Sequence, residues 1–131
     1  MLDLFAGSGA LALEALSRGA EVAFLVESDP SARAAIRANI AALGAAATLV
    51  GHDATALPAA PRPADLLLLD PPYGAGLAAP ALASAAARGW LTPAAWIAVE
   101  TARGEALEVP GFVADTVRPV AKAALHLLRP A

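Results

Sequence analysis

The segment Asp70-Pro71-Pro72-Tyr73 combines residue types that suit the binding of a planar amine. It follows the apolar run 66–69, which predicts a buried strand, and prolines cannot continue a sheet because they lack an N–H group. Asp70 is therefore expected at the carboxyl end of that strand, where open α/β sheets bind ligands. Its carboxylate and the Pro71 carbonyl would be fixed hydrogen-bond acceptors beside the flat ring of Tyr73. We interpret these residues as a site for a base with an exocyclic NH2 group; the alternative is a rigid surface turn.

A second segment, Gly7-Ser8-Gly9-Ala10-Leu11-Ala12, matches the pattern G-x-G-x-x-G/A between a predicted strand and a predicted helix. Glycines allow a sharp turn there and a close approach of a ligand to the backbone. Glu27 ends the next predicted strand, where an acidic residue can accept hydrogen bonds from both ribose hydroxyls. The pattern favours a nucleoside ligand over its alternatives, which are a plain strand–helix turn and a solvated strand-end charge.

Three more carboxylates lie in or near the predicted strand ends, and Asp3 narrows the choice of ligand. Asp3 lies close to the glycine turn, where it would repel the pyrophosphate of a dinucleotide but attract the ammonium and sulfonium groups of S-adenosylmethionine. A structural hydrogen-bond acceptor is the alternative for Asp3. Asp53 is expected to accept from an adenine amino group beside the backbone N–H of Ala54, with a turn carboxylate as a nearly equal alternative. Asp29 is predicted to cap the helix that follows it.

Predicted strands and helices alternate along most of the chain. Strands are predicted at residues 2–5, 22–26, 48–50, 65–69 and 96–100, and helices at residues 10–18, 31–43 and 77–88. Two final strands, forming a hairpin, are predicted at residues 112–118 and 123–128, with a turn at 90–93 and irregular structure at 101–111. The expected fold class is α/β, with a mostly parallel sheet, helices on both faces and a C-terminal antiparallel hairpin.

The composition predicts one globular domain. The chain has 131 residues, of which 58% are hydrophobic, and this suffices for a single core across residues 1–131. Its apolar runs are shorter than the roughly 18 residues of a membrane span, and its first residues lack the basic region of a signal peptide. The absence of cysteine excludes disulfides and thiolate metal sites and fits the cytoplasm. We expect no membrane association, no metal site and a monomer, with His52 and His126 structural or exposed.

The charge balance bears on nucleic-acid binding. The formal net charge is −3 and no cluster of Lys or Arg stands out, which argues against a module dedicated to gripping a phosphate backbone. It does not argue against an enzyme that touches nucleic acid locally. We interpret Arg18, Arg88, Arg103 and Arg118 as scattered solvated side chains rather than as an RNA-facing patch.

Taken together, these motifs resemble one protein family. The matching segments are residues 3–11 and 14–20, Val26-Glu27, Asn39 and Asp70-Pro71-Pro72-Tyr73. They resemble the RsmD family of 16S ribosomal RNA guanine-N2 methyltransferases, a branch of the Rossmann-like class I methyltransferases. The resemblance runs from residue 1 to about residue 100 and is loose beyond it.

The resemblance implies a cofactor, a substrate and a site. S-adenosylmethionine would bind at Asp3, Gly7, Gly9, Glu27 and Asp53, with Phe5, Ala6 and Ala54 beside them. The catalytic residues would be Asp70, Pro71, Pro72 and Tyr73, holding a guanine of the guanine-966 type for methylation at N2. The partner would be 16S rRNA or the assembling small ribosomal subunit. Members of the family carry a further N-terminal segment that helps close the site and touch RNA, so the chain is expected to be N-terminally truncated.

Other functions fit part of the pattern. The Asp70–Tyr73 loop would also serve the amines of DNA adenine, DNA cytosine or protein glutamine. A small nicotinamide-binding Rossmann domain would explain the glycines and Glu27, but not Asp3 or the Asp70–Tyr73 loop. A non-catalytic remnant that still binds a cofactor or a partner is the third alternative.

Overall fold

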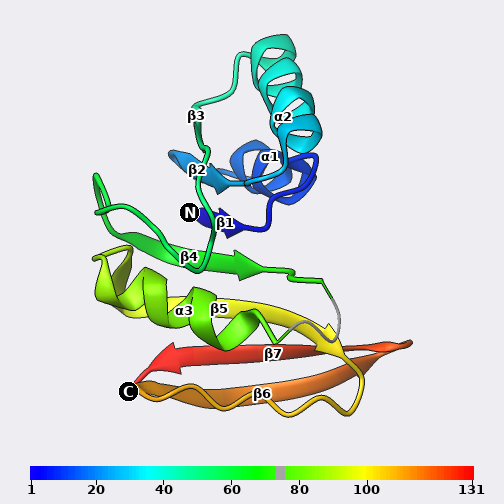
Figure 1. The fold of residues 1–131 in the computed structure, drawn as a ribbon, viewed down its shortest axis with the longest axis vertical. Helices are drawn as coiled ribbons and strands as arrows, with labels where there is room; N and C mark the ends of the chain where they lie inside the picture. The colour runs from blue at the N-terminus through cyan, green and yellow to red at the C-terminus, as the bar shows by residue number, and fades with distance from the viewer. Residues whose placement is uncertain (73–75) are drawn as a thin grey trace.

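The computed structural model describes residues 1–72 and 76–131, so the predicted stacking residue Tyr73 lies outside the described part. Within that part, one seven-stranded sheet has the strand order β3-β2-β1-β4-β5-β7-β6 (Figure 1). The strands are β1 (Leu2–Leu4), β2 (Ala23–Val26), β3 (Ala47–Val50), β4 (Ala64–Leu69), β5 (Leu91–Ala102), β6 (Phe112–Val120) and β7 (Ala123–Pro130). The helices are α1 (Ala10–Ser17), α2 (Pro30–Leu43) and α3 (Ala78–Ala87).

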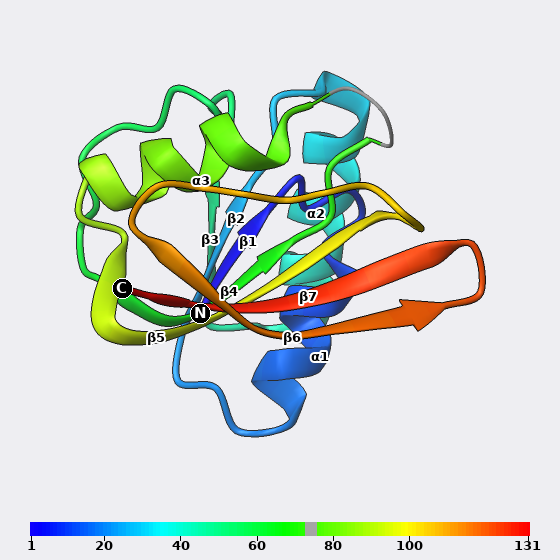
Figure 2. The same cartoon turned by 90° about the horizontal axis from the view of Figure 1, so that it is seen from below.

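Strands β1 to β5 form the parallel part of the sheet, and helices cover both of its faces. Helices α1 and α2 lie on one face and α3 on the other (Figure 2). Leu2 and Leu4 pack on the α3 side, whereas Leu25 packs with Ala12 and Ile36 on the side of α1 and α2. This arrangement confirms the predicted α/β class, because parallel strands are stable when both faces are covered.

Local signals set the ends of the helices. Asp29 accepts a hydrogen bond from the Ala32 backbone N–H at 2.9 Å through Oδ2, and Pro30 occupies the first turn of α2, so the predicted N-cap is confirmed. Gly44 ends α2 in the left-handed conformation, with φ of 60°. Helix α1 begins after Gly9, which has φ of 82° and provides no side-chain cap.

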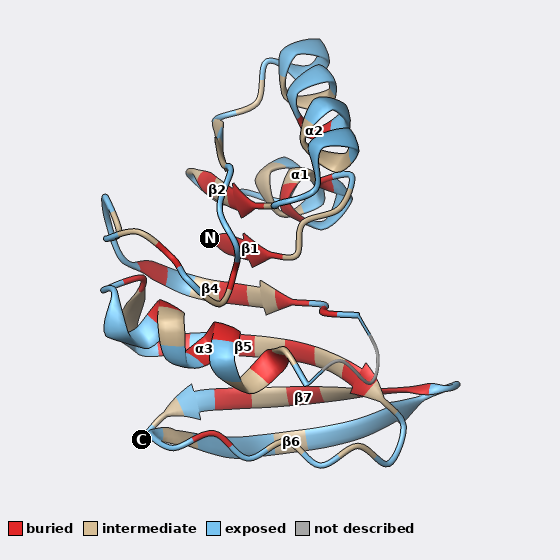
Figure 3. Ribbon diagram, viewed as in Figure 1, coloured by how far each residue is buried: buried red, intermediate tan, exposed pale blue. Residues whose placement is uncertain are grey.

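The core is concentrated on the central strands, as Figure 3 shows by the buried residues of β1, β4 and β5. Leu67, Leu69, Ile97 and Val99 are almost completely buried beneath α3. Burying each such side chain contributes on the order of 1.5–3 kcal/mol. The loops that carry the candidate site therefore follow strands whose side chains are deeply buried.

Strand β5 departs from the sequence-based prediction. A turn was predicted at residues 90–93, but β5 begins at Leu91 and includes Pro93. The pairing with β4 shifts here, because Ala64 pairs with Leu91 and Leu66 with Trp96. Pro93 falls inside this irregularity, where a missing N–H group disrupts no regular ladder. The strand also continues to Ala102, beyond the predicted end at residue 100.

The last two strands form the predicted antiparallel hairpin. Strand β7 pairs with β6 on one side and with β5 on the other, and both pairings are antiparallel. Strand β6 is therefore the edge of the sheet, and its residue Pro119 lies where a missing donor is tolerated. The hairpin turns at residues 121–122, beside the end of β5.

Candidate functional site

The glycine turn and Asp70 leave the sheet at the same edge. Strands β1 and β4 are parallel neighbours in which Leu4 pairs with Leu69 (Figure 1). The two strands therefore end side by side at the carboxyl edge of the sheet. The glycine turn follows β1 and Asp70 follows β4. This proximity is the geometric condition for any transfer between a nucleoside ligand at the turn and an amine at Asp70.

A cavity of about 620 Å³ opens between these two loops. Its lining residues are Phe5, Glu27, Ser28, Asp70, Pro71, Pro72, Leu77 and Glu100. The volume lies within the usual range of ligand sites, roughly 300–1,000 Å³. The cavity brings together predicted cofactor residues, Phe5 and Glu27, with three of the four predicted substrate residues.

A larger cavity, of about 740 Å³, lies at the opposite, amino edge of the strands. Met1, Arg18, Arg62 and Asp65 are among its lining residues, and none of the predicted site residues that the structure describes lines it. We place the candidate site at the carboxyl edge, because the loops that follow parallel strands converge there with their polar groups.

The glycine turn has a left-handed backbone at alternate positions. Phe5, Gly7 and Gly9 have φ values of 61°, 59° and 82°. A Cβ atom on Gly9 would lie 2.8 Å from Cδ2 of Leu25, so glycine is required for α1 to pack on β2. A Cβ atom on Gly7 would meet nothing within 4 Å, so the backbone of Gly7 stays open to a ligand.

The side chain of Glu27 accepts hydrogen bonds from two backbone N–H groups, one in the glycine turn and one before α2. Its Oε1 accepts from the Gly7 N–H at 2.9 Å, and its Oε2 accepts from the Asp29 N–H at 3.0 Å. The carboxylate thereby holds the glycine turn against the start of α2, a role that the sequence analysis did not foresee. Each oxygen retains acceptor capacity, since a carboxylate offers about four lone-pair positions.

Asp3 lies in the middle of β1, on the face covered by α1 and α2. Its side chain is 1% exposed, and no residue in the described part of the chain hydrogen-bonds to Oδ2. Burial raises the pKa of this carboxyl to about 7, a hydrogen bond from the Ala12 backbone opposes the rise, and the charges of Asp70 and Glu27 add to it. The predicted cofactor residue thus sits beneath the start of α1 with one buried oxygen unsatisfied.

Asp53 and Ala54 follow β3 at the same edge but do not line the 620 Å³ cavity. Oδ1 of Asp53 accepts from the backbone N–H of Thr55 at 2.8 Å and from the Thr55 hydroxyl at 2.7 Å. These bonds lower the pKa of Asp53. In this structure Asp53 closes a local turn, the alternative to an adenine contact that the sequence also allows. Ala54 is buried in the core.

Asp70 lies at the mouth of the cavity. Partial burial raises the pKa of its carboxyl, and the nearby charge of Glu100 raises it further. Pro71 is buried and Pro72 is exposed. The sequence analysis missed Glu100, which lines the same cavity from the neighbouring strand; the signal was an acidic residue at the predicted end of a strand parallel to β4.

The two histidines stand apart from this cavity. His52 is exposed. His126 is buried, and its Nε2 lies 2.9 Å from the hydroxyl oxygen of Thr101. The Thr101 hydroxyl also lies 3.1 Å from the Ala102 carbonyl. Burial lowers the pKa of His126, and neither histidine lines the 620 Å³ cavity.

Two further properties concern the described residues. Among residues 1–72 and 76–131, no three His, Asp or Glu side chains are grouped as metal ligands. No helix in this part of the chain has both the length and the apolarity needed to cross a bilayer.

Solved structures share this fold. HI0767 from Haemophilus influenzae superimposes with a TM-score of 0.86 at 29% identity, over 98% of this chain and 84% of that chain. The protein yhhF from Escherichia coli also gives 0.86, at 33% identity, over 98% of this chain and 74% of that chain. The fold is that of the Rossmann-like class I methyltransferases, as expected from the sequence.

Curated relatives match over a shorter span. Ribosomal RNA small subunit methyltransferase D of Escherichia coli K12 is 40% identical over 102 residues, which cover 76% of this chain and 52% of the relative. The protein of the same name from Haemophilus influenzae is 33% identical over 115 residues, covering 83% and 60%. The chain thus spans about half the length of the first of these relatives.

The family comparison covers nearly the whole chain. The model of the family described as Conserved hypothetical protein 95 matches residues 1–123. This span includes both loops of the carboxyl-edge cavity and the first strand of the terminal hairpin, and it ends at the first residue of β7. The chain therefore belongs to this family, the RsmD family that its sequence motifs resemble.

Proposed function

We propose that this chain is a methyltransferase domain that transfers a methyl group from S-adenosylmethionine to the exocyclic N2 of a guanine in 16S rRNA. One observation carries the proposal: Glu27 and the Asp70-Pro71-Pro72 loop line a single cavity at the carboxyl edge of the sheet. The names of the curated relatives support ribosomal RNA as the substrate class. The amine chemistry of the loop supports the exocyclic nitrogen as the acceptor.

The charges of the site fit a cationic nucleoside. Glu27, Asp70 and Glu100 line the cavity, and its described lining includes no Lys or Arg. Asp3 adds a buried carboxyl oxygen without a hydrogen-bond partner among the described residues. These groups would attract the ammonium and sulfonium of S-adenosylmethionine and would repel the pyrophosphate of a dinucleotide. When bound, the cofactor supplies a methyl group that its sulfonium has already activated.

The residues expected to hold the cofactor are Asp3, Phe5, Ala6, Gly7, Gly9, Glu27, Asp53 and Ala54. Glu27 would accept from the ribose hydroxyls with the lone pairs that its two backbone bonds leave available. Gly7 would let the ligand lie against the backbone, since no side chain occupies the space where a Cβ would project. Asp53 would turn an oxygen to the adenine amine beside the Ala54 N–H.

Chemistry at the amine needs alignment more than a base. The lone pair of a guanine amino nitrogen is delocalised into the ring, so this nitrogen is a weak nucleophile. The Asp70 carboxylate and the Pro71 carbonyl would accept its two N–H groups and turn the lone pair toward the methyl group. The same acceptors would stabilise the positive charge that develops on nitrogen as the N–C bond forms and the methyl–sulfur bond breaks. The Asp70 carboxylate would then take one N–H proton from the methylated amine, with a neutral thioether as the other product. Tyr73 would stack on the base, which must leave any helix to enter the cavity.

A methyl-transfer assay tests the proposal. The protein is incubated with labelled S-adenosylmethionine and, separately, with an unmethylated small-subunit rRNA transcript, duplex DNA and a protein pool. We expect label in RNA only, recovered as N2-methylguanosine after digestion to nucleosides. Label in DNA or in protein glutamine would replace the RNA substrate with one of the alternatives. Calorimetry with S-adenosylmethionine and with a nicotinamide dinucleotide checks the cofactor, and binding of the dinucleotide alone would overturn the proposal.

A further inference from the structure

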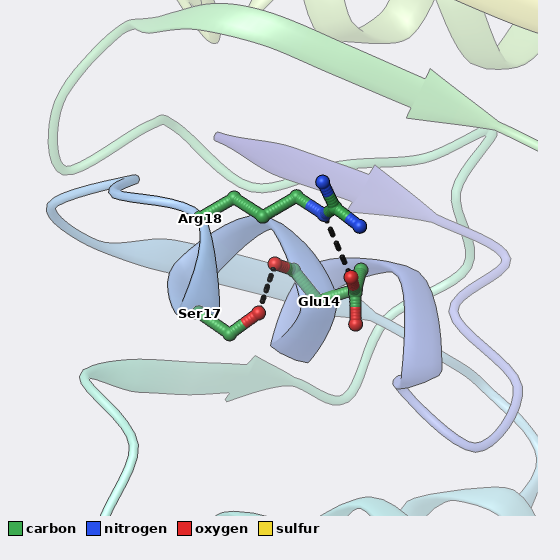
Figure 4. A network of polar contacts seen from close by, with 3 residues as sticks. All are labelled: Glu14, Ser17 and Arg18. Carbon is green, nitrogen blue, oxygen red and sulfur yellow. Dashed lines mark hydrogen bonds and ion pairs between the residues drawn. The ribbon is translucent and has the colours of Figure 1, made fainter.

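Cations at the amino edge of the molecule are neutralised within the chain. Nε of Arg18 contacts Oε1 of Glu14 at 2.7 Å on the surface of α1 (Figure 4). Nη2 of Arg62 lies 3.8 Å from Oε2 of Glu21. Both arginines line the amino-edge cavity, far from the candidate site along the strands.

The tip of the β6–β7 hairpin lies at the other edge, beside the candidate site. The last paired residue of β5, Ala102, faces Ala123, and Ala123 also pairs with Val120 at the end of β6. The connecting residues 121 and 122 therefore project at the carboxyl edge of β5, where Glu100 lines the cavity. Figure 1 shows the hairpin extending past the end of β5 on this side.

Three exposed cations lie at this tip: Arg103, Arg118 and Lys122, which we call the tip cluster. Arg103 and Arg118, interpreted from the sequence as scattered side chains, thus lie near one another in the fold. The Arg103 backbone N–H donates to the Lys122 carbonyl at 2.9 Å, and Nη1 of Arg103 donates to the Ala121 carbonyl at 3.3 Å. Arg118 lies in register with Leu125, which in turn lies in register with Glu100. Neither ion pair found within the described residues involves the tip cluster.

The tip cluster and the cavity have opposite charge. Residues 112–130 contain Arg118 and Lys122 at the tip, Arg129 at the far end of the hairpin and one Asp, in a chain whose net charge is −3. Glu105 is the acidic residue beside Arg103, and its Oε2 accepts from the Ala102 N–H at 3.1 Å. The cavity beside the tip cluster is lined by carboxylates. Arg118 lies on β6 and Asp70 follows β4. These strands are three strand spacings apart in the sheet, a distance on the order of 14 Å. A polyanion could therefore engage the tip while an uncharged part of it enters the cavity.

We propose that the tip cluster binds the phosphates of the RNA that flank the target nucleotide, while the acidic cavity admits only the uncharged base. This inference rests on the proposed function and adds the surface that positions its substrate. Phosphate contacts fix the register of a bound nucleic acid, and base contacts supply the specificity. The acidic lining would repel the backbone from the cavity, so cations outside the cavity must hold it.

The test removes the tip charges and measures RNA binding and methyl transfer separately. The variant Arg103→Ala/Arg118→Ala/Lys122→Ala of the full chain is titrated with a small-subunit rRNA transcript at several salt concentrations. We expect the slope of log K against log salt to become less steep by about 2–3, since each lost phosphate contact removes close to one unit. We expect KM for RNA to rise at least tenfold, with kcat and the affinity for S-adenosylmethionine unchanged.

Single variants provide matched controls. Arg118→Ala and Arg62→Ala each remove one exposed arginine, at the carboxyl and the amino edge respectively. Only Arg118→Ala should raise KM and flatten the salt slope, and Arg118→Lys should restore both. Equal effects of the two alanine variants, or an unchanged salt slope in the triple variant, would overturn the proposal. A triple variant that loses only salt-independent binding to an assembled ribosomal particle would assign the tip to a protein partner and also overturn it.

Failure of this inference can be distinguished from failure of the proposed function. If the wild-type chain binds RNA through the tip cluster but transfers no methyl group, the phosphate-binding surface stands and the proposed activity does not. If the wild-type chain methylates RNA with kinetics that the triple variant reproduces, the activity stands and the tip cluster has no part in it. If the wild-type chain does not bind RNA at all, the inference is wrong.

Discussion

Two carboxyl groups of the site, Asp3 and Asp70, are held in surroundings that disfavour their charge. Burial is the leading cause in both cases, and neighbouring carboxylates add to it. Asp3 is buried beneath α1, whereas Asp70 is exposed and lines the cavity. The same direction of shift therefore bears on different properties: the pH dependence of stability for Asp3, and the proposed role as a hydrogen-bond acceptor for Asp70.

Asp70→Asn tests the acceptor role at the cavity mouth. The amide keeps the shape of the carboxylate but removes its negative charge, so the charge developing on the amine loses its stabilisation. We expect kcat for methyl transfer to fall by about 10²–10³, the usual cost of losing one such electrostatic contact, and the calorimetric affinity for S-adenosylmethionine to stay within about twofold. Asp65→Asn, at the exposed start of the same strand, is the control. Near-normal turnover of Asp70→Asn would refute the role.

Asp3→Asn tests the buried carboxyl through the pH dependence of stability. A carboxyl whose pKa rises from 3.8 unfolded to about 7 folded binds more protons in the folded state. Its contribution to the free energy of unfolding is therefore lost as pH rises from about 4 to about 7. The loss amounts to at most about 4 kcal/mol. Urea denaturation of the wild type should show this fall relative to Asp3→Asn, whereas parallel curves would contradict the burial of an ionisable Asp3.

At the scale of elements, the glycine turn is defined by packing as well as by backbone conformation. Gly9 is buried between β2 and α2, and Gly7 is held by Glu27. Asn39 of α2 adds a bond from Nδ2 to the Ser8 carbonyl at 3.0 Å. Strand β1, the turn and two helices are thus joined around one short loop, which keeps the floor of the candidate site in place.

Comparing Gly9→Ala with Gly104→Ala separates the two reasons for glycine at residue 9, which are its backbone conformation and its packing. Gly104 lies outside the glycine turn and serves as the control. The φ values are similar, 82° and 84°, but only the Cβ at residue 9 would meet an atom, Cδ2 of the fully buried Leu25 at 2.8 Å. Gly104→Ala should lower the free energy of unfolding by about 1–2 kcal/mol through backbone strain alone. Gly9→Ala should cost roughly 1–3 kcal/mol more through overpacking. Urea denaturation measures both, and equal losses would show that packing is not limiting.

At the scale of the whole molecule, the two tryptophans report on different environments. Trp90 is fully buried, packs edge to face on Phe24 with ring centroids 5.6 Å apart, and donates from Nε1 to the Pro58 carbonyl at 2.8 Å. Trp96 is 42% exposed, with the Arg129 guanidinium 4.7 Å from its ring centroid. The first ties the proline-rich loop before β4 to the core, and the second lies on an open face of the sheet.

Replacing each tryptophan by phenylalanine should separate these roles. Trp90→Phe should lower the free energy of unfolding by roughly 2–4 kcal/mol, because it leaves a cavity and an unpaired carbonyl. Trp96→Phe should cost less than about 1 kcal/mol, the scale of an exposed cation–π contact. Acrylamide should quench the fluorescence of Trp90→Phe, which retains Trp96, far more than that of Trp96→Phe. The opposite order of quenching would contradict the packing.

Much of this architecture follows from local sequence signals. The alternation of apolar strands and capped helices, including Asp29 before Pro30, predicted the α/β class and the edge at which Asp70 lies. The order β5-β7-β6 depends on pairings between distant residues, which periodicity does not encode. The inclusion of Pro93 in β5 depends on a register shift. The two hydrogen bonds that the Glu27 carboxylate accepts from the backbone depend on how the glycine turn meets α2. Those features required the assembled sheet.

Strand β5 has neighbours that run in opposite senses: β4 beside it in parallel and β7 in antiparallel. Ile97, Ala98 and Val99 are paired on both sides, and Ile97 and Val99 are fully buried. Each of these amide hydrogens can exchange with solvent only after the neighbouring strand that accepts it, β4 or β7, has separated from β5. Deuterium uptake should therefore advance from the outer strands β3 and β6 toward the middle. The seam between the parallel half of the sheet and the hairpin would be the last part of the molecule to open.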